Sequence, residues 1–173
     1  MRQLNTEIRQ PQSCNDFDIA AFCSLVRQGG EVEVDGLEER VRTARALAFL
    51  YIDRALAGIA ALKQPNRRHR DGVFIAAGLA NAADFAFELG WVFVPPEHRG
   101  RGYSWIVSAA ALSQADGIST FATTRLDNVP MQKTLSRLSF NRAGDAWASS
   151  RGEYQLVLYV TSPSQRLSTG VPG

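Results

Sequence analysis

The sequence predicts an α/β fold, because segments with a helical spacing of apolar residues alternate along the chain with segments of strand character. In residues 16–28 the apolar side chains recur at helical spacing, at Ile19, Phe22, Cys23 and Val26. Residues 85–94, FAFELGWVFV, give the strongest strand pattern, since they are rich in aromatic residues and end at Pro95. At 173 residues and 45% hydrophobic composition, the chain can bury a core of its own.

The N-terminal half is predicted to hold two helices and three strands. The expected elements are a strand at 6–9, helices at 16–28 and 36–46, two strands within 47–65 and a polar loop at 66–72, NRRHRDG. Gly29 and Gly30 end the first helix, and a turn near Asp53 and Arg54 separates the two strands.

The C-terminal half continues the alternation after the strand at 85–94. The expected elements are a helix at 103–115, a strand at 118–124, a helix at 128–140 and a last strand at 151–160. Small residues in the first of these helices suit close packing on a sheet, while Met131, Leu135 and Leu138 form an apolar stripe on the second.

The strand at 85–94 is predicted to have one bulky face and one open face. Strict alternation places Phe85, Phe87, Leu89, Trp91 and Phe93 on the first face, and Ala86, Glu88, Gly90, Val92 and Val94 on the second. A bulge at Gly90 would reset this alternation in the second half of the strand.

Composition narrows the class of protein. A net charge of +2 does not mark a nucleic-acid binder or a membrane-surface protein. The start, MRQLNTEIRQ, lacks the apolar stretch of a secretory signal, and no run approaches the roughly 18 apolar residues of a membrane span. We therefore expect a cytoplasmic protein, with one domain at 1–161 and a flexible tail at 162–173, which is rich in Ser, Pro and Gly.

Cysteine and histidine are too few for a disulfide framework or a metal site. Cys14 and Cys23 show no C-x-x-C spacing and are expected to be ordinary thiols. His69 and His98 cannot build a His/Cys ligand cluster with them. We expect no metal cofactor.

Residues 94–104, VPPEHRGRGYS, join the predicted strand to the next helix. Gly100 and Gly102 allow a ligand to approach the backbone, and Arg99 and Arg101 favour an anion. A helix start adds unpaired N–H groups and the positive end of its dipole, a combination that suits phosphate. Two other phosphate-binding motifs do not fit this stretch. The Gly-Lys-Ser/Thr of a P-loop is absent, and the dinucleotide-binding motif G-x-G-x-x-G would need a glycine where Trp105 stands. A plain surface turn is the alternative.

The stretch HRGRGYS resembles the pyrophosphate-binding motif Q/R-x-x-G-x-G/A of the GNAT acetyltransferase superfamily, with serine at the last position. Residues 88–102 resemble that superfamily's fourth strand and the following loop. Residues 123–140 resemble its second conserved block, Asn-x-x-Ala-x-x-Leu-Tyr-x-x-x-Gly-Phe. Asn128 and Phe140 match this block, and the departures from it are Met131, Thr134, Leu135 and Ser139. The order of elements also fits over residues 8–160.

The resemblance implies the GNAT acyl-CoA N-acyltransferase fold, a mixed, mostly antiparallel sheet of about seven strands flanked by about four helices. It implies acetyl-CoA as acetyl donor and CoA as product, with the pyrophosphate on the loop and the pantetheine along the edge of the 86–94 strand. The implied cofactor-binding residues are Val92, Phe93, Val94, Arg99, Gly100, Arg101, Gly102, Tyr103, Ser104 and Asn128. Asn128 is also a good helix N-cap, and the two roles can coexist.

Glu88 is the candidate catalytic base, at a spacing before Arg99 that is similar to that of the catalytic glutamate in histone-acetylating members. Its aromatic neighbours lead us to expect a raised pKa, the alternative being a strand glutamate that faces solvent. Backbone N–H groups near 92–94 would polarise the thioester carbonyl, as the resemblance implies. Many members have a tyrosine acid where Leu135 stands, which puts the usual general acid in doubt. The alternatives are Tyr154 or Tyr159 near the end of the chain, and water, since a thiol is a tolerable leaving group, whereas Thr134 and Ser136 are expected to be ordinary helix residues.

The acceptor is expected to meet the arginines of PNRRHRDG, residues 65–72. The candidate substrate-binding residues are Arg67, Arg68 and Arg70, which favour an acceptor carrying a carboxylate or phosphate, unless the run is solvated loop. We predict an N-acetyltransferase that acts by direct transfer on a primary amine in a small molecule or peptide. The alternatives are an acyl-CoA binding protein with little turnover and an aminoacyl-tRNA acetylating toxin. We expect neither a membrane nor a nucleic acid as partner, and leave a homodimer open.

Overall fold

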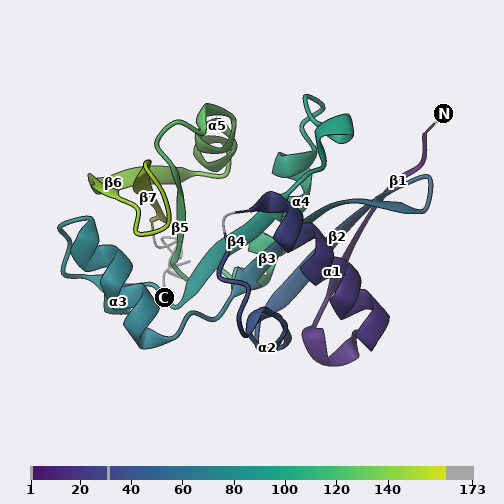
Figure 1. Cartoon of the computed structure of the whole chain (residues 1–173), viewed down its shortest axis with the longest axis horizontal. Helices are drawn as coiled ribbons and strands as arrows, with labels where there is room; N and C mark the ends of the chain where they lie inside the picture. The colour runs from purple at the N-terminus through teal and green to yellow at the C-terminus, as the bar shows by residue number, and fades with distance from the viewer. Residues whose placement is uncertain (1, 31, 163–173) are drawn as a thin grey trace, which may run out of the picture.

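The computed structural model describes residues 2–30 and 32–162, so the tail predicted at 162–173 lies outside the described residues from residue 163 onward. A seven-stranded sheet has the order β1-β2-β3-β4-β5-β7-β6 (Figure 1). The strands are β1 Leu4–Arg9, β2 Ala46–Ile52, β3 Ala55–Lys63, β4 Phe87–Phe93, β5 Thr120–Arg125, β6 Phe140–Ala148 and β7 Gln155–Thr161. Neighbouring strands are antiparallel, except for the parallel pair β4 and β5. This mixed sheet confirms the fold class.

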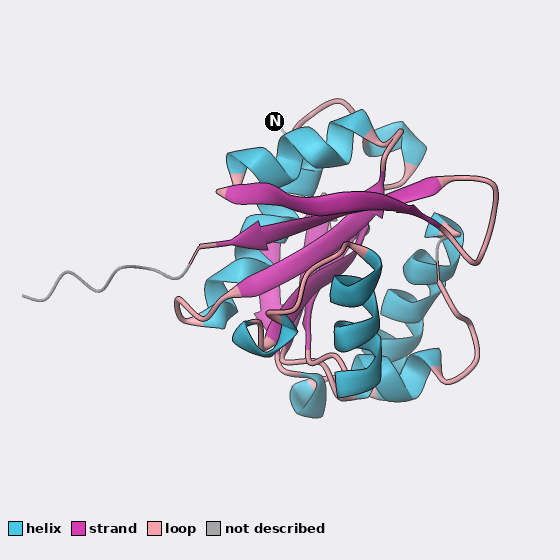
Figure 2. Cartoon of the chain, turned by 90° about the vertical axis from the view of Figure 1, so that its left-hand side faces the viewer, coloured by secondary structure: helices cyan, strands magenta, loops and turns pink. Residues whose placement is uncertain are grey.

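Helices cover both faces of the sheet (Figure 2). They are α1 Asp16–Gly29, α2 Leu37–Arg42, α3 Arg67–Ala76, α4 Tyr103–Leu112 and α5 Val129–Arg137. On β2, Leu47 and Phe49 pack in the core beside α1 and α2, whereas Ala48 and Leu50 pack in the core beside α4 and α5. This period-two alternation is what a strand buried on both faces requires. Helix α3 packs on the same face of the sheet as α1 and α2. Its Phe74 contacts Phe121 of β5 there.

The prediction of a polar loop at 66–72 is wrong, because these residues form the first half of α3. The side chain of Asn66 caps this helix by accepting a hydrogen bond from the His69 N–H at 2.8 Å. Its apolar anchor, Phe74, follows the polar stretch and is buried against Phe85 and Phe121. The first turn carries only polar side chains, so the apolar periodicity that marks a helix begins too late in the sequence to be seen.

Strand β6 was not singled out along the sequence, although the order of elements in the GNAT superfamily includes it. Its residues, FNRAGDAWA, mix small apolar residues with Asn, Arg, Gly and Asp, and it lies at the edge of the sheet with most side chains exposed or half-buried. An edge strand needs no apolar face of its own on the solvent side, which removes the usual strand signal.

A bulge in β4 resets the alternation of its side chains. Ile59 on β3 is opposite Phe93, but Ala61 is opposite Gly90, so β4 has one residue more than β3 over this interval. Trp91 takes a φ of 50°, an unusual conformation for a bulky residue. The predicted alternative, a bulge at Gly90 that resets the alternation, is therefore confirmed: Trp91 and Phe93 turn toward α1, while Leu89 and Val92 pack toward α4. Strict alternation also fails at Phe85, which precedes the strand and packs with Phe74 of α3.

Candidate active site

Strands β4 and β5 separate just after Glu88. Their pairing consists of Phe87 with Thr120 and Glu88 with Phe121. Beyond this point β5 stays paired with β7 as far as Arg125, whereas β4 runs along β3 alone. Figure 1 shows the two strands diverging. Within the described residues, the side of β4 that faces β5 is thus without a strand partner, and an extended ligand can hydrogen-bond to it.

The loop that follows β4 forms an open cradle at the start of α4. Gly100 and Gly102 have φ values of 76° and 77°, and a Cβ atom on either glycine would meet nothing within 4 Å. Gly102 is the N-cap of α4, and none of the described side chains caps this helix. The first-turn N–H groups therefore face open space together with the positive end of the helix dipole, as an anion site requires.

The two arginines of this loop differ in their contacts. Arg99 donates a hydrogen bond from Nε to the carbonyl of Val94 at 2.9 Å, and its guanidinium lies 5.7 Å from the Phe93 ring centroid. It therefore fastens the loop to the end of β4. Arg101 is exposed at the cradle, and its charge is available to a ligand.

Two buried polar atoms flank the loop. Within residues 2–30 and 32–162, neither Nδ1 of His98 nor Nε1 of Trp105 has a hydrogen-bond partner. Buried polar groups are normally hydrogen-bonded, and these two atoms beside the loop are exceptions. The space above the two glycines, the uncapped start of α4 and the exposed Arg101 suit an anionic group such as a diphosphate.

Helix α5, which follows β5, contributes a capped N-terminus and a core residue. The side chain of Asn128 accepts a hydrogen bond from the Met131 N–H at 3.2 Å, so its predicted role as N-cap is confirmed. Leu135, where many GNAT members have tyrosine, is fully buried in the core. The Tyr159 hydroxyl donates to Oε1 of Gln132 on α5 at 3.1 Å, which places one candidate for the acid against this helix.

Glu88 is buried between β3 and α3. It is only 4% exposed, and its Oε2 lies 3.0 Å from Nζ of Lys63 and 3.1 Å from Nε2 of His69. Lys63 is its direct partner in the β3–β4 register, and His69 reaches it from the first turn of α3. The alternative of a glutamate that faces solvent is therefore wrong.

The pKa of Glu88 is lowered to about 2, which corrects the expectation of a raised value. Burial raises this pKa, but the charge of Lys63 and the hydrogen bond with His69 lower it by more. The prediction weighed only the aromatic residues of the same strand. A carboxyl group with this pKa is ionised at neutral pH and is a weak proton acceptor.

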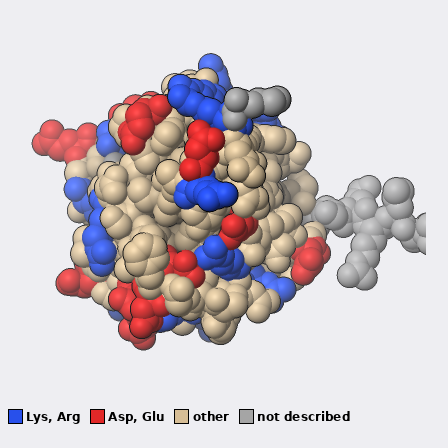
Figure 3. Space-filling model, turned by 90° about the vertical axis from the view of Figure 1, so that its right-hand side faces the viewer, with Lys and Arg blue, Asp and Glu red and all other residues tan. Residues whose placement is uncertain are grey.

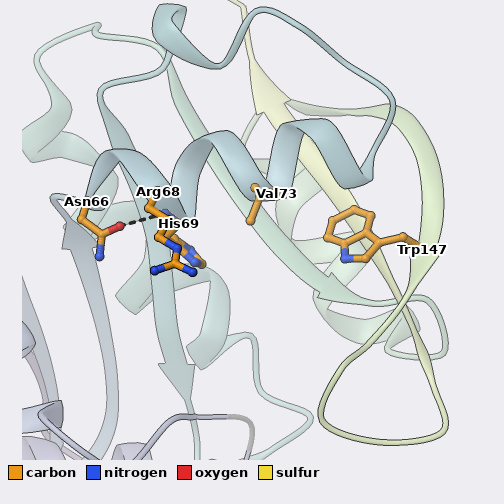
Figure 4. Close-up of a pocket in the computed structure, with 6 residues that line it drawn as sticks. Asn66, Arg68, His69, Val73 and Trp147 are labelled. Carbon is orange, nitrogen blue, oxygen red and sulfur yellow. Dashed lines mark hydrogen bonds between the residues drawn. The ribbon is translucent and has the colours of Figure 1, made fainter.

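A hollow of about 410 Å³ lies beside the first turn of α3 (Figure 4). Its lining residues are Asn66, Arg68, His69, Gly72, Val73 and Trp147. Of the three candidate substrate-binding arginines, Arg68 lines this hollow. Arg67 has an 87% exposed side chain and pairs with Asp71, and Arg70 reaches Asp71 and the carbonyl of Phe85.

His69 is the site residue that the sequence analysis did not single out. It was weighed as a metal ligand and as one member of a basic run, and neither view predicts a contact with a residue 19 positions away. The available signal was local: an asparagine three positions earlier is typical of a helix N-cap and would have placed His69 in an ordered first turn.

The described ranges contain neither a metal-binding cluster nor a membrane-spanning helix. No group of three or more His, Cys, Asp or Glu residues there is placed to hold a metal ion. Likewise, none of the helices within residues 2–30 and 32–162 has both the length and the apolar character to cross a bilayer.

No protein-family model matches the chain, and no curated protein sequence matches it significantly. Solved structures do match. A GNAT-family acetyltransferase from Streptococcus agalactiae has a TM-score of 0.65 at 15% identity, over 90% of this chain and 94% of its own. YncA from Salmonella typhimurium, in a structure with acetyl-CoA, has a TM-score of 0.67 at 12% identity, over 94% and 96%. The ribosomal-protein-S18-alanine N-acetyltransferase of Escherichia coli has 0.65 at 11%, over 99% and 100%. At such identities the likeness concerns the fold.

Proposed function

Because the chain has the fold of GNAT acetyltransferases, we propose that it is an N-acetyltransferase that transfers an acetyl group from acetyl-CoA to a primary amine in a ternary complex. The observation that carries this proposal is that an open loop follows a strand edge without a strand partner among the described residues. The open cradle of Gly100 and Gly102 comes after β4, and the β4–β5 pairing ends at Glu88 on the same strand.

The residues of this loop and strand have distinct proposed roles. The first turn of α4 and its two glycines, together with Arg101, would hold the diphosphate. Backbone groups at 92–94 would pair with the pantetheine and polarise the thioester carbonyl. The side-chain NH₂ of Asn128 would donate a hydrogen bond to the pantetheine, while its oxygen caps α5. When bound, acetyl-CoA supplies the activated acetyl group. Glu88, at the last β4–β5 pair, would assist the deprotonation of the acceptor amine.

Calorimetry and acetylation assays with a matched pair of glycine variants test this proposal. In Gly102→Ala the new Cβ enters the cradle, whereas in Gly36→Ala it lies at the N-cap of α2, which has a similar φ of 69°. Both variants carry the same kind of backbone strain, about 1–2 kcal/mol. We expect Gly102→Ala alone to weaken acetyl-CoA binding, by at least tenfold. Equal affinities for acetyl-CoA in the two variants would contradict the proposed loop.

One specific observation favours a second candidate function, an acyl-CoA binding protein with little turnover. The buried Leu135 offers no hydroxyl group where many GNAT members have their acid. A panel of primary amines separates the two functions: the enzyme acetylates at least one amine, and Glu88→Gln removes this activity while sparing acetyl-CoA affinity. The binding protein would show the same affinity and no acetylated product.

The charge distribution does not favour the aminoacyl-tRNA alternative. Arg67 and Arg70 both pair with Asp71, which neutralises part of the basic run. On the side of the molecule opposite α3, which Figure 3 shows, Lys and Arg are also interspersed with Asp and Glu. A polyanion needs a continuous basic surface for most of its affinity.

A further inference from the structure

We infer that His69 takes the proton from the acceptor amine and that Glu88 is the positioning residue that holds its imidazole. This inference rests on the proposed function and assigns the acceptor to the hollow beside α3. His69 is the side chain that joins the two parts of the site: its ring lines the hollow, and its Nε2 is 3.1 Å from Oε2 of Glu88, where β4 and β5 separate.

Hydrogen bonding fixes the orientation of the imidazole. The ionised Glu88 carboxylate can only accept, so Nε2 of His69 must carry the hydrogen in this contact. In the neutral ring the lone pair is then on Nδ1. No hydrogen bond joins Nδ1 to another described residue, and 44% of the side chain is exposed. The backbone is held as well, because Asn66 accepts from the His69 N–H.

The same geometry makes Glu88 a poor candidate for taking the proton itself. Its Oε2 already meets both Nζ of Lys63 and Nε2 of His69, and the side chain is almost fully buried. An amine in the hollow therefore meets the histidine ring before it can reach the carboxylate. Figure 4 shows Arg68 and His69 at the start of α3, with Val73 further along the helix and Trp147 beyond it.

The proton step involves only the amine and the chain. An ammonium group in the hollow gives one proton to Nδ1, its N–H bond breaks, and an N–H bond forms on the ring. The products are a neutral amine and an imidazolium whose charge is stabilised by Glu88, and the exposed ring later releases the proton to water. The charged groups around the ring are Glu88 from β4, Lys63 from β3 and Arg68 from α3; the residue from β6, Trp147, is uncharged.

His69→Gln isolates this step, because the glutamine amide can still donate to Glu88 but cannot take up a proton. General base catalysis contributes about 10²–10⁴-fold, so kcat/KM at pH 7 should fall by that factor while acetyl-CoA affinity is unchanged. The deficit should shrink as the pH rises toward the pKa of the acceptor amine, since the solvent then supplies the neutral amine. Ile75→Gln, at an exposed position of the same helix, is the matched control and should stay within about twofold.

A second readout does not depend on activity. The chain has two histidines, so the imidazole ¹⁵N signals of His69 can be assigned by their loss in His69→Gln. The neutral ring should carry its hydrogen on Nε2 in the wild-type protein, and this preference should weaken in Glu88→Gln, whose amide can both donate and accept. A neutral ring with its hydrogen on Nδ1 would overturn the inference.

The kinetic outcomes separate this inference from the proposed function. If the wild-type protein binds acetyl-CoA and acetylates an amine while His69→Gln stays within threefold of it at pH 7, the inference fails and the proposed function stands. The inference also fails if the deficit of His69→Gln is constant from pH 6 to pH 10, as a merely structural role would give. If the wild-type protein neither binds acetyl-CoA nor acetylates any amine, both fail.

Discussion

Lys63 and Glu88 are direct partners across the β3–β4 pair, and Nζ of Lys63 lies 3.0 Å from Oε2 of Glu88 in the interior of the protein. The same ammonium group lies 4.8 Å from the Trp91 ring centroid, on the bulge of β4. This ion pair keeps a carboxylate at the point where β4 leaves β5. It therefore links the stability of the fold to the chemistry of the candidate active site.

Folding stability should decrease as the pH falls from about 4.5 to about 2, in part because of Glu88. The folded pKa of about 2 is below the ordinary value of 4.5, so within this range the unfolded chain binds a proton that the folded protein does not. The contribution of Glu88 is complete above pH 4.5 and is worth on the order of 3 kcal/mol. Urea unfolding between pH 2 and pH 6 should show a weaker pH dependence in Glu88→Gln. Parallel curves for the two proteins would rule out this contribution.

Removing the partner of a buried charge should cost more than removing the pair. Lys63→Met leaves the Glu88 carboxylate with only His69, and we expect the free energy of unfolding to drop by about 3–5 kcal/mol. The double variant with Glu88→Gln should recover part of this loss, because no unpaired charge is left inside. Lys133→Met, at an exposed position on α5, should change stability by less than about 0.5 kcal/mol. Denaturant unfolding measures all three, and a nearly neutral Lys63→Met would refute the ion pair.

Two glycines around α3 should respond in opposite directions to alanine. Gly72 lies inside the helix with nothing within 4 Å of an added Cβ, so Gly72→Ala should stabilise the protein by about 0.5–1 kcal/mol. Gly144 on β6 has a φ of 67°, and an added Cβ would come within 2.2 Å of the Ala77 carbonyl oxygen, which accepts from the Asp145 N–H. Gly144→Ala should therefore cost more than about 2 kcal/mol. Thermal unfolding of the two variants measures both effects. A loss of stability in Gly72→Ala would contradict the helical conformation of residues 67–76.

Arg68 should recognise a negatively charged group on the acceptor. If so, Arg68→Gln raises KM for an amine that carries a carboxylate by about 10–100-fold, the effect of losing one charge-assisted hydrogen bond. It should leave KM for an uncharged amine nearly unchanged. Arg67→Gln is the matched control, since this neighbour points to solvent and pairs with Asp71. Equal effects of the two substitutions on steady-state KM would show that the hollow does not select the acceptor.

The sequence predicts most of the fold because most of its elements carry their own signals. The strand at 85–94, the glycine-arginine loop and the helix capped by Asn128 all depend on residues close together in the chain. The error at residues 66–72 has a different origin. Helix α3 depends on the burial of Phe74 against Phe121, a residue 47 positions further along the chain, and the polar first turn gives no sign of it.

The chemistry of the candidate site was predicted less completely for the same reason. The position of Glu88 follows from its own strand, but its low pKa depends on Lys63, 25 positions earlier, and on His69, 19 positions earlier. Neither distance can be obtained from spacing along the chain. A glycine at position 90 was enough to predict a bulge as an alternative. The position at which the side-chain alternation of β4 changes follows only from its pairing with β3.

Titration of the wild-type protein with acetyl-CoA in a calorimeter tests the central claim most directly. The account predicts saturable binding of one acetyl-CoA per chain well below millimolar concentration, with CoA competing for the same site and Gly102→Ala weakening both ligands. If the folded protein takes up no acetyl-CoA at millimolar concentration, then the cradle after β4 is not a diphosphate site and the account is contradicted.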